Sequence, residues 1–171
     1  VVCNLPNGDG PIVLPMAGDV GSQYITTAGW AQAITYHRDT LKDASWAGSI
    51  AVALGGDGSV ATNGFWSALT MATTLKLPML FYIEDNDLGI SVKGEMQTPG
   101  GNIARNLASF ANLFVRDGDG TDPAASAALL KECVDHVRGG TGPALVRLTL
   151  PRLSSHSGPD NQKGYRTDAE I

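Results

Sequence analysis

The sequence is poor in cysteine and carries no concentration of positive charge. Cys3 and Cys133 are the only two cysteines in 171 residues, and they lie far apart without the spacing of a metal site. This excludes a small disulfide-stapled scaffold and favours two reduced thiols in an intracellular protein. The formal net charge is −5 and no run of lysine or arginine occurs, so neither nucleic acid nor an anionic membrane is expected as a partner.

Long apolar runs and the common phosphate-binding motifs are also missing. No stretch is long enough to cross a bilayer. Neither GxxxxGK(S/T) nor a GxGxxG that opens a helix after a strand is present. The segment "DGDGTD" (117–122) begins like a calcium loop, but Asp122 stands where glycine is required and Ala128 where glutamate is required. A plain turn is therefore predicted there.

Short apolar segments alternate with helix-like segments. Strands are expected at 49–54, 77–85, 113–116 and 143–150, and helices at 22–39, 65–76, 101–112 and from Pro123 up to Gly139. Strands this short and almost wholly apolar are typical of a parallel sheet that helices cover on both faces. We therefore predict a three-layer α/β fold in a single domain that spans residues 1–171.

Both ends of the sequence indicate an excerpt of a longer polypeptide. The chain begins Val-Val without a methionine or a signal peptide, and it stops at "YRTDAEI", where a helix is expected to begin. Localisation signals are therefore expected to lie outside this sequence.

The tripeptide Gly-Asp-Gly occurs at residues 8–10, 56–58 and 118–120. The first copy has no preceding strand and the third precedes a helix capped by Asp122, so both are predicted to be turns. The second copy follows a buried strand, as does "EDND" (84–87). Because ligands of a parallel sheet bind beyond the carboxyl ends of its strands, Asp57 and Asn86 are expected together at that edge.

These two side chains offer the oxygen ligands that magnesium or calcium prefers when the ion also holds a phosphate. Without a cation, an aspartate about 4 Å from a phosphate charge would be repelled by about 4 kcal/mol at an effective dielectric constant of about 20. A divalent ion between them reverses the sign. Gly56 and Gly58 would let the backbone approach the ligand closely.

The stretch "GDGSVATNGFWSALTMATTLKLPMLFYIEDNDLGIS" resembles the thiamine-diphosphate motif, in which an asparagine follows Gly-Asp-Gly after about thirty residues. Here Asn86 follows Asp57 by 29 positions (86 − 57). The closing "LPRLSSHSGPDNQKGYR" narrows the resemblance to the alpha subunits of 2-oxo acid dehydrogenase complexes, of the pyruvate and branched-chain types. The resemblance covers almost the whole chain and implies the thiamine-diphosphate-binding fold.

The resemblance implies a set of site residues. Magnesium would be held by Asp57, Asn86 and the backbone carbonyl of Leu88. Arg105 and Arg152 would contact the diphosphate, and His156 would be the catalytic residue at the reactive thiazolium end, where it binds or orients the 2-oxo acid. The full cofactor-binding set is Gly56, Asp57, Gly58, Ser59, Asn86, Leu88, Arg105, Arg152 and His156.

Further residues match the family with structural or regulatory roles. Asp160, Tyr165 and Arg166 would organise the loop around His156. Ser157 matches the serine that mitochondrial members phosphorylate, although the sequence does not reveal whether this chain is regulated in that way. Ser22 and Gln23 would lie beside the cofactor or a structural potassium ion.

The implied function is thiamine-diphosphate-dependent oxidative decarboxylation of a small 2-oxo acid, with acyl transfer to lipoamide. The implied partners are a beta subunit and a dihydrolipoyl acyltransferase core. The beta subunit would form an α2β2 heterotetramer with this chain and would supply the activating glutamate. The compartment would be the cytoplasm in a bacterium or archaeon and the mitochondrial matrix in a eukaryote. An acetoin dehydrogenase, a transketolase-like enzyme and a non-catalytic subunit that keeps the fold remain alternatives, and the substrate stays open.

Two departures from the family pattern concern the site. Asp85-Asn86 stands in place of Asn-Asn, which keeps the ligand but makes the surroundings more negative, and leucine replaces an aromatic residue at 88. "TNG" (62–64) replaces a more acidic stretch. Simpler roles also exist: Asp57 as a turn residue, Arg105 as a solvated helix cation and His156 as a loop histidine.

Overall fold

The computed structural model describes residues 10–14 and 18–171, whose centre is a parallel sheet of four strands. The strands are β1 (Ala51–Gly56), β2 (Met79–Asp85), β5 (Phe114–Asp119) and β6 (Ala144–Thr149). Their order is β1-β2-β6-β5, and every neighbouring pair is parallel. Gly56 lies opposite Glu84, and Asp85 opposite Thr149. The carboxyl ends therefore meet at one edge, as predicted.

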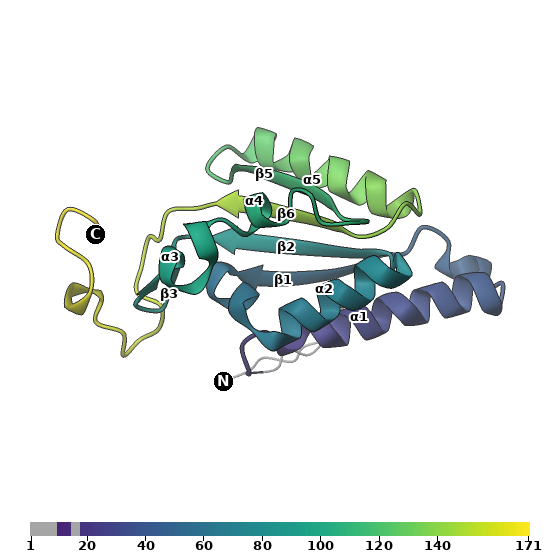
Figure 1. The fold of residues 1–171 in the computed structure, drawn as a ribbon, viewed down its shortest axis with the longest axis horizontal. Coiled ribbons are helices and arrows are strands. Elements are labelled where there is room, and N and C mark those ends of the chain that lie inside the picture. The colour runs from purple at the N-terminus through teal and green to yellow at the C-terminus, as the bar shows by residue number, and fades with distance from the viewer. Residues whose placement is uncertain (1–9, 15–17) are drawn as a thin grey trace.

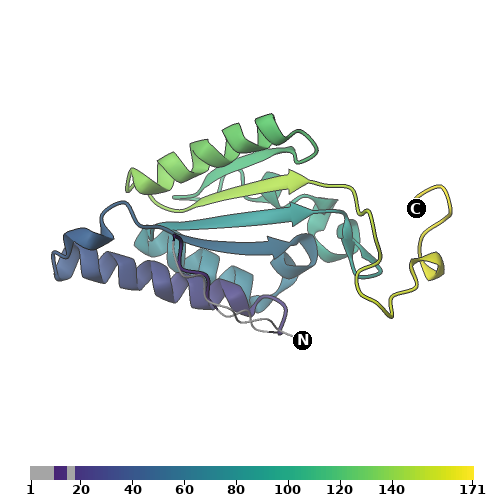
Figure 2. The ribbon, with the colours of Figure 1, turned by 180° about the vertical axis from the view of Figure 1, so that it is seen from behind.

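Helices cover both faces of the sheet, which confirms the predicted three-layer α/β class. The three long helices are α1 (Ser22–Thr35), α2 (Asn63–Leu75) and α5 (Pro123–Arg138). α1 and α2 lie on one side of the sheet and α5 on the other (Figures 1 and 2). Within the part of the chain that the structure describes, no helix is both long and apolar enough to cross a bilayer.

Successive side chains of a strand point to opposite faces of the sheet, and this divides the core into two clusters. Phe81 and Ile83 of β2 are buried against α1 and α2, whereas Leu80 is buried with Cys133 and Val137 of α5. The central strands β2 and β6 alternate between two apolar layers instead of between core and solvent, because both of their faces are covered, whereas Val52 and Leu54 of the edge strand β1 are exposed. This explains why the sequences of β2 and β6 are almost continuously apolar.

Small residues bring α1 and α2 close together where both helices begin. A Cβ atom at Gly21 would lie 2.0 Å from the Thr62 Oγ1 atom, and one at Gly64 would lie 2.3 Å from the Gly21 carbonyl oxygen. Gly21 also has a φ of +88°, which favours glycine. The prediction for 22–39 is confirmed as a helix, although its end becomes a π-helical turn, η1 (Tyr36–Thr40).

The predicted helix at 101–112 is wrong in length. Gly100 and Gly101 have φ values of +70° and +67°, so the helix starts only at Ile103, after Asn102, whose side chain caps it. Leu107 ends it after one turn. The short elements of the region are β3 (Leu88–Gly89), β4 (Val92–Lys93), α3 (Gly94–Gln97), η4 (Pro99–Gly101) and α4 (Ile103–Asn106).

The third Gly-Asp-Gly is only partly a turn, because Gly118 and Asp119 are the last residues of β5. The predicted cap after it is confirmed: the Asp122 carboxylate accepts hydrogen bonds from the amides of Ala124 and Ala125, at 2.9 and 3.1 Å. Of the first copy, Gly8 and Asp9 lie outside the described residues.

Cys133 is expected to resist alkylation in the folded protein at pH 8 and to react once the protein is unfolded. Burial raises the pKa of its thiol from 9.0 to about 11. The protonated Cys133 thiol therefore makes its full favourable contribution to the free energy of unfolding below pH 9, and this contribution is lost as the pH rises towards 11. Iodoacetamide labelling of residues 1–171 with Cys3→Ser, which leaves Cys133 as the only cysteine among those residues, measures this. Rapid labelling of the native form would contradict the buried placement.

Candidate functional site

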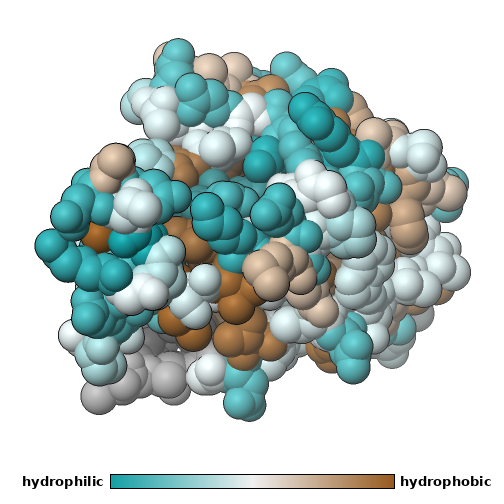
Figure 3. All heavy atoms as spheres, turned by 60° about the vertical axis from the view of Figure 1, so that its left-hand side comes forward, coloured by the Kyte–Doolittle hydropathy of each residue, from teal (hydrophilic) through white to brown (hydrophobic). Residues whose placement is uncertain are grey.

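The carboxyl edge of the sheet carries the predicted metal-binding segments. Asp57 opens a 3₁₀ helix, η3 (Asp57–Ala61), directly after β1, and Asn86 follows β2. The segment after Pro151 leaves β6 at the same edge and extends beyond the body of the protein (Figures 1 and 2). Figure 3 turns this edge of the sheet towards the viewer. The surface there is mostly hydrophilic, and hydrophobic residues are exposed between the hydrophilic ones.

Asp57 is buried with one carboxylate oxygen unsatisfied. The residue is 7% exposed, and its Oδ2 atom accepts no hydrogen bond from any described residue. Burial raises the pKa of Asp57, and the nearby Asp85 carboxylate raises it further, against the lowering effect of the Asp57 and Asn86 backbone amides. A buried carboxylate oxygen without a partner is costly. A bound cation would remove that cost.

Asn86 keeps an oxygen lone pair available beside Asp57. Its Oδ1 atom accepts a hydrogen bond from the Leu88 amide at 3.1 Å, and an amide oxygen has two lone pairs. Leu88 itself is paired with Lys93 in the β3–β4 hairpin. The hairpin therefore fixes the backbone whose Leu88 carbonyl is the third predicted ligand.

Residues 55–59, the glycine-rich segment, leave little room for side chains. A Cβ atom at Gly58 would lie 3.1 Å from the Gln97 Oε1 atom and 3.2 Å from the Gly89 Cα atom. Ser59 is buried, and its hydroxyl is hydrogen-bonded to the Tyr24 hydroxyl and the Gly56 carbonyl, both at 2.6 Å. The Ser59 side chain thus stabilises the turn, which leaves the backbone to meet a ligand.

The start of α1 lies against the end of β1. The Gln23 side chain donates a hydrogen bond to the Leu54 carbonyl at 3.1 Å, and the Ser22 hydroxyl donates to the Asp19 carbonyl at 2.7 Å. Gln23 thereby lies next to the residues that lead into Gly55 and Gly56.

Arg147 is a residue that the sequence reasoning missed. Its guanidinium lies 2.6 Å from the Asp85 carboxylate and 2.8 Å from that of Asp117, and the side chains of Arg147 and Asp85 are only 12% and 6% exposed. The extra negative charge expected from Asp85 is therefore paired inside the protein. The signal was an isolated arginine in the apolar strand "PALVRLTL", since a buried charge requires a partner.

Arg105 lies on α4, close to β5. The Asn102 Oδ1 atom accepts a hydrogen bond from the Arg105 amide at 2.9 Å, and the Asn102 Nδ2 atom donates one to the Asp117 carboxylate at 2.8 Å. The Arg105 guanidinium is exposed and has no hydrogen bond or ion pair to other described residues. It is free to meet an anion.

Arg152 is bound within the C-terminal loop. It donates to the Ile90 carbonyl, to the Asp160 carboxylate at 2.9 Å and to the Tyr165 hydroxyl at 3.0 Å. Asp160 also accepts hydrogen bonds from the Tyr165 hydroxyl and the His156 amide, which, with Arg152 nearby, lower its pKa. These contacts match the organising roles predicted for Asp160 and Tyr165.

His156 is exposed on that loop, and among the described residues no hydrogen bond or ion pair joins it to Asp57 or Asn86. The structure thus brings together Asp57, Asn86 and Leu88, with Arg105 on a neighbouring helix of the same sheet edge. It places His156 and Arg152 on the loop after β6, which Arg152 joins to the β3–β4 hairpin through the Ile90 carbonyl.

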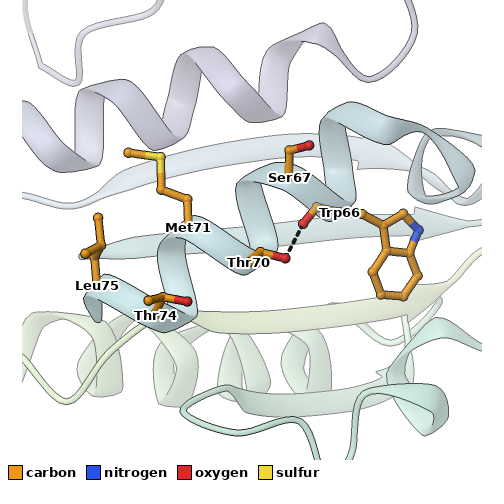
Figure 4. A pocket seen from close by; sticks show the side chains of 6 residues that line it. All are labelled: Trp66, Ser67, Thr70, Met71, Thr74 and Leu75. Atoms are coloured by element: carbon orange, nitrogen blue, oxygen red, sulfur yellow. Dashed lines mark hydrogen bonds between the residues drawn. The ribbon is translucent and has the colours of Figure 1, made fainter.

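An open groove runs along the outward face of α2. It has a volume of about 600 Å³ and is bordered by small, apolar and hydroxyl-bearing side chains (Figure 4). Trp66 at one end is 42% exposed and Leu75 at the other is 53% exposed. The lining residues are Trp66, Ser67, Thr70, Met71, Thr74 and Leu75.

Comparison with known families and curated proteins yields a consistent result. The model of the dehydrogenase E1 component family matches residues 9–171. The 3-methyl-2-oxobutanoate dehydrogenase subunit alpha of Mycobacterium tuberculosis is 29% identical over 92% of this chain and 40% of its own length. The mitochondrial pyruvate dehydrogenase E1 component subunit alpha of Dictyostelium discoideum is 30% identical over 90% of this chain and 38% of its own. The chain thus spans about two fifths of the length of these relatives.

A solved structure supports the fold. A transketolase from Campylobacter jejuni superposes with a TM-score of 0.63 over 78% of this chain and 20% of its own, at 18% sequence identity. At that identity the likeness concerns the arrangement of strands and helices.

Proposed function

We propose, since this chain belongs to the dehydrogenase E1 component family, that it forms the magnesium- and diphosphate-binding part of the alpha subunit of a 2-oxo acid dehydrogenase. The reaction would be the thiamine-diphosphate-dependent oxidative decarboxylation of a small 2-oxo acid, with acyl transfer to lipoamide. Relatives named as pyruvate and 3-methyl-2-oxobutanoate dehydrogenase alpha subunits support this proposal.

The single observation that carries the proposal is the unsatisfied, buried Oδ2 atom of Asp57. The residues present fit a magnesium ion: the Asp57 carboxylate, the second lone pair of the Asn86 amide and the Leu88 carbonyl are hard oxygen donors. Such an ion would cancel the repulsion between Asp57 and a phosphate. The proposal also includes a structural potassium ion near Ser22 and Gln23.

Thiamine diphosphate, when bound, supplies the electron sink for decarboxylation. The residues of this chain would hold it in place: the backbone of Gly56, Gly58 and Ser59 would lie against the diphosphate, and Arg105 and Arg152 would offset its charge. His156 would orient the 2-oxo acid. Arg152 would act from within its loop network, and that network would also position His156.

The proposed partners are a beta subunit, in an α2β2 assembly, and a dihydrolipoyl acyltransferase core. The word "subunit" in the relatives' names supports an assembly. The exposed apolar groove on α2 is a surface that such an assembly would cover. The compartment would be the cytoplasm in a bacterium or archaeon and the mitochondrial matrix in a eukaryote.

The subunit alone is expected to bind thiamine diphosphate weakly and to show no turnover, whereas the reconstituted assembly should decarboxylate a 2-oxo acid. The reason is that the activating glutamate is expected from the beta subunit. The measurement is reduction of an artificial electron acceptor with pyruvate, branched-chain 2-oxo acids and acetoin, with and without the beta subunit.

The substrate panel also separates the alternatives. Turnover of acetoin alone would assign an acetoin dehydrogenase. Turnover by the isolated subunit would overturn the shared-site account. Unchanged activity of the assembly after Asp57→Ala would mean that this chain is a non-catalytic subunit.

A further inference from the structure

A continuous chain of polar contacts crosses the carboxyl edge of the sheet from β2 to α4. Asp85 is paired with Arg147, Arg147 with Asp117, and Asp117 accepts a hydrogen bond from Asn102, at 2.6, 2.8 and 2.8 Å respectively. We call these four residues the edge network. We propose that the edge network is a positioning unit that fixes Arg105 relative to Asn86. It would thereby hold the residue that contacts the diphosphate at a set position relative to the residue that binds the metal.

The first end of the network fixes the metal-binding turn. Asp85 immediately precedes Asn86, and its Oδ1 atom accepts a hydrogen bond from the Asp87 amide at 2.9 Å. Asp87 has a left-handed φ of +63°, a conformation that residues other than glycine adopt only when neighbouring groups stabilise it. With one carboxylate oxygen on Asp87 and the other on Arg147, Asp85 holds the turn that presents the Asn86 side chain.

The other end fixes α4. This helix has only four residues, and so short a helix has little stability of its own. Asn102 joins it to the sheet, because its oxygen caps the Arg105 amide while its amide group donates to Asp117. The Arg105 side chain itself has no hydrogen bond or ion pair to other described residues, so its place follows from the backbone of α4, which Asn102 holds.

Arg147 makes the network continuous because one guanidinium serves both carboxylates. Its Nε atom donates to Asp85, and its Nη1 atom donates to Asp117 and to the Thr149 hydroxyl. A planar donor group of this kind fixes angles as well as distances. A shift of α4 would therefore be felt at the metal-binding turn.

This inference rests on the proposed function, and three variants of the full-length subunit, assembled with its partner, test it. Asn102→Ser keeps a capping oxygen without adding charge, but its hydroxyl is too short to reach Asp117. Asn102→Asp also keeps the cap but turns the donor into an acceptor that faces a carboxylate. Asn102→Asp combined with Asp117→Asn restores one donor and one acceptor at the original net charge.

The probes are thiamine diphosphate with saturating Mg²⁺, titrated by calorimetry, and the thermal midpoint of each variant. Asn102→Ser and Asn102→Asp should each weaken thiamine diphosphate binding by about tenfold, as expected when one hydrogen bond to a charged group is lost. The combined variant should return to within about threefold of the wild type.

The outcomes separate the two proposals. If the wild type shows no Mg²⁺-dependent binding, the proposed function fails before the variants matter. If the wild type binds but the single variants change only the thermal midpoint, the network is structural and the inference is wrong. The inference is also wrong if only Asn102→Asp weakens binding, because added charge and not position would then be the cause. It is wrong as well if the combined variant stays weak, because restoring one donor and one acceptor at the original net charge would then not restore binding.

Discussion

An Asp57→Asn variant is expected to be more stable than the wild type without metal and to lose Mg²⁺-dependent binding of thiamine diphosphate. The wild-type carboxylate is buried with an unsatisfied oxygen, so removing its charge should raise the free energy of unfolding by about 1–3 kcal/mol. Because its folded pKa is raised above 3.8, the contribution of Asp57 to stability is favourable at acidic pH and is lost as the pH rises through the folded value.

Urea unfolding at pH 7 in the presence of EDTA measures the first effect, and calorimetric titration with the cofactor and Mg²⁺ measures the second. Asp168→Asn is the matched control, because that carboxylate is 87% exposed and its removal should change neither quantity. A less stable Asp57→Asn protein would show that Asp57 has a structural partner, and unchanged binding would remove it from the metal site.

An Arg147→Met variant is expected to lose about 3–5 kcal/mol of unfolding free energy. The change keeps a long side chain but leaves the Asp85 carboxylate, only 6% exposed, without its partner. An uncompensated buried charge is among the most destabilising results of a single substitution. Urea unfolding of the metal-free subunit measures the loss.

The combined Asp85→Asn, Arg147→Met variant separates lost charge pairing from lost packing. Asparagine keeps an oxygen to accept the hydrogen bond from the Asp87 amide, and neither position 85 nor position 147 then carries a buried charge. We expect the combined variant to recover most of the lost stability. If it is as unstable as Arg147→Met alone, the packing of the arginine side chain, and not its charge, supports this edge.

The fold was predictable because its signals are local and repeated. Four apolar segments in alternation with helical ones define a covered parallel sheet, and Asp122-Pro123 marks the start of α5. The helix predicted at 101–112 failed because Ile103, Leu107 and Phe110 have a helical spacing that one turn and a following bend also satisfy. Periodicity alone does not distinguish the two arrangements.

The site was predictable only in part, because its members follow different strands. Asp57 and Asn86 were found from their positions after neighbouring strands, and the register of β1 on β2 places them at one edge. The pairing of Asp85 with Arg147 depends on which strand lies next to β2, and the strand order was not predicted. The place of His156 depends on a loop that extends beyond the sheet (Figure 1).

The central claim is that this edge of the sheet holds thiamine diphosphate through a magnesium ion on Asp57. The most direct measurement is calorimetric titration of thiamine diphosphate into the assembled wild-type protein, with Mg²⁺ and then with EDTA. The account predicts saturable binding with Mg²⁺, a loss of at least about a hundredfold in affinity with EDTA, and the same loss in Asp57→Asn with Mg²⁺ present. Equal affinity with and without the metal would contradict it.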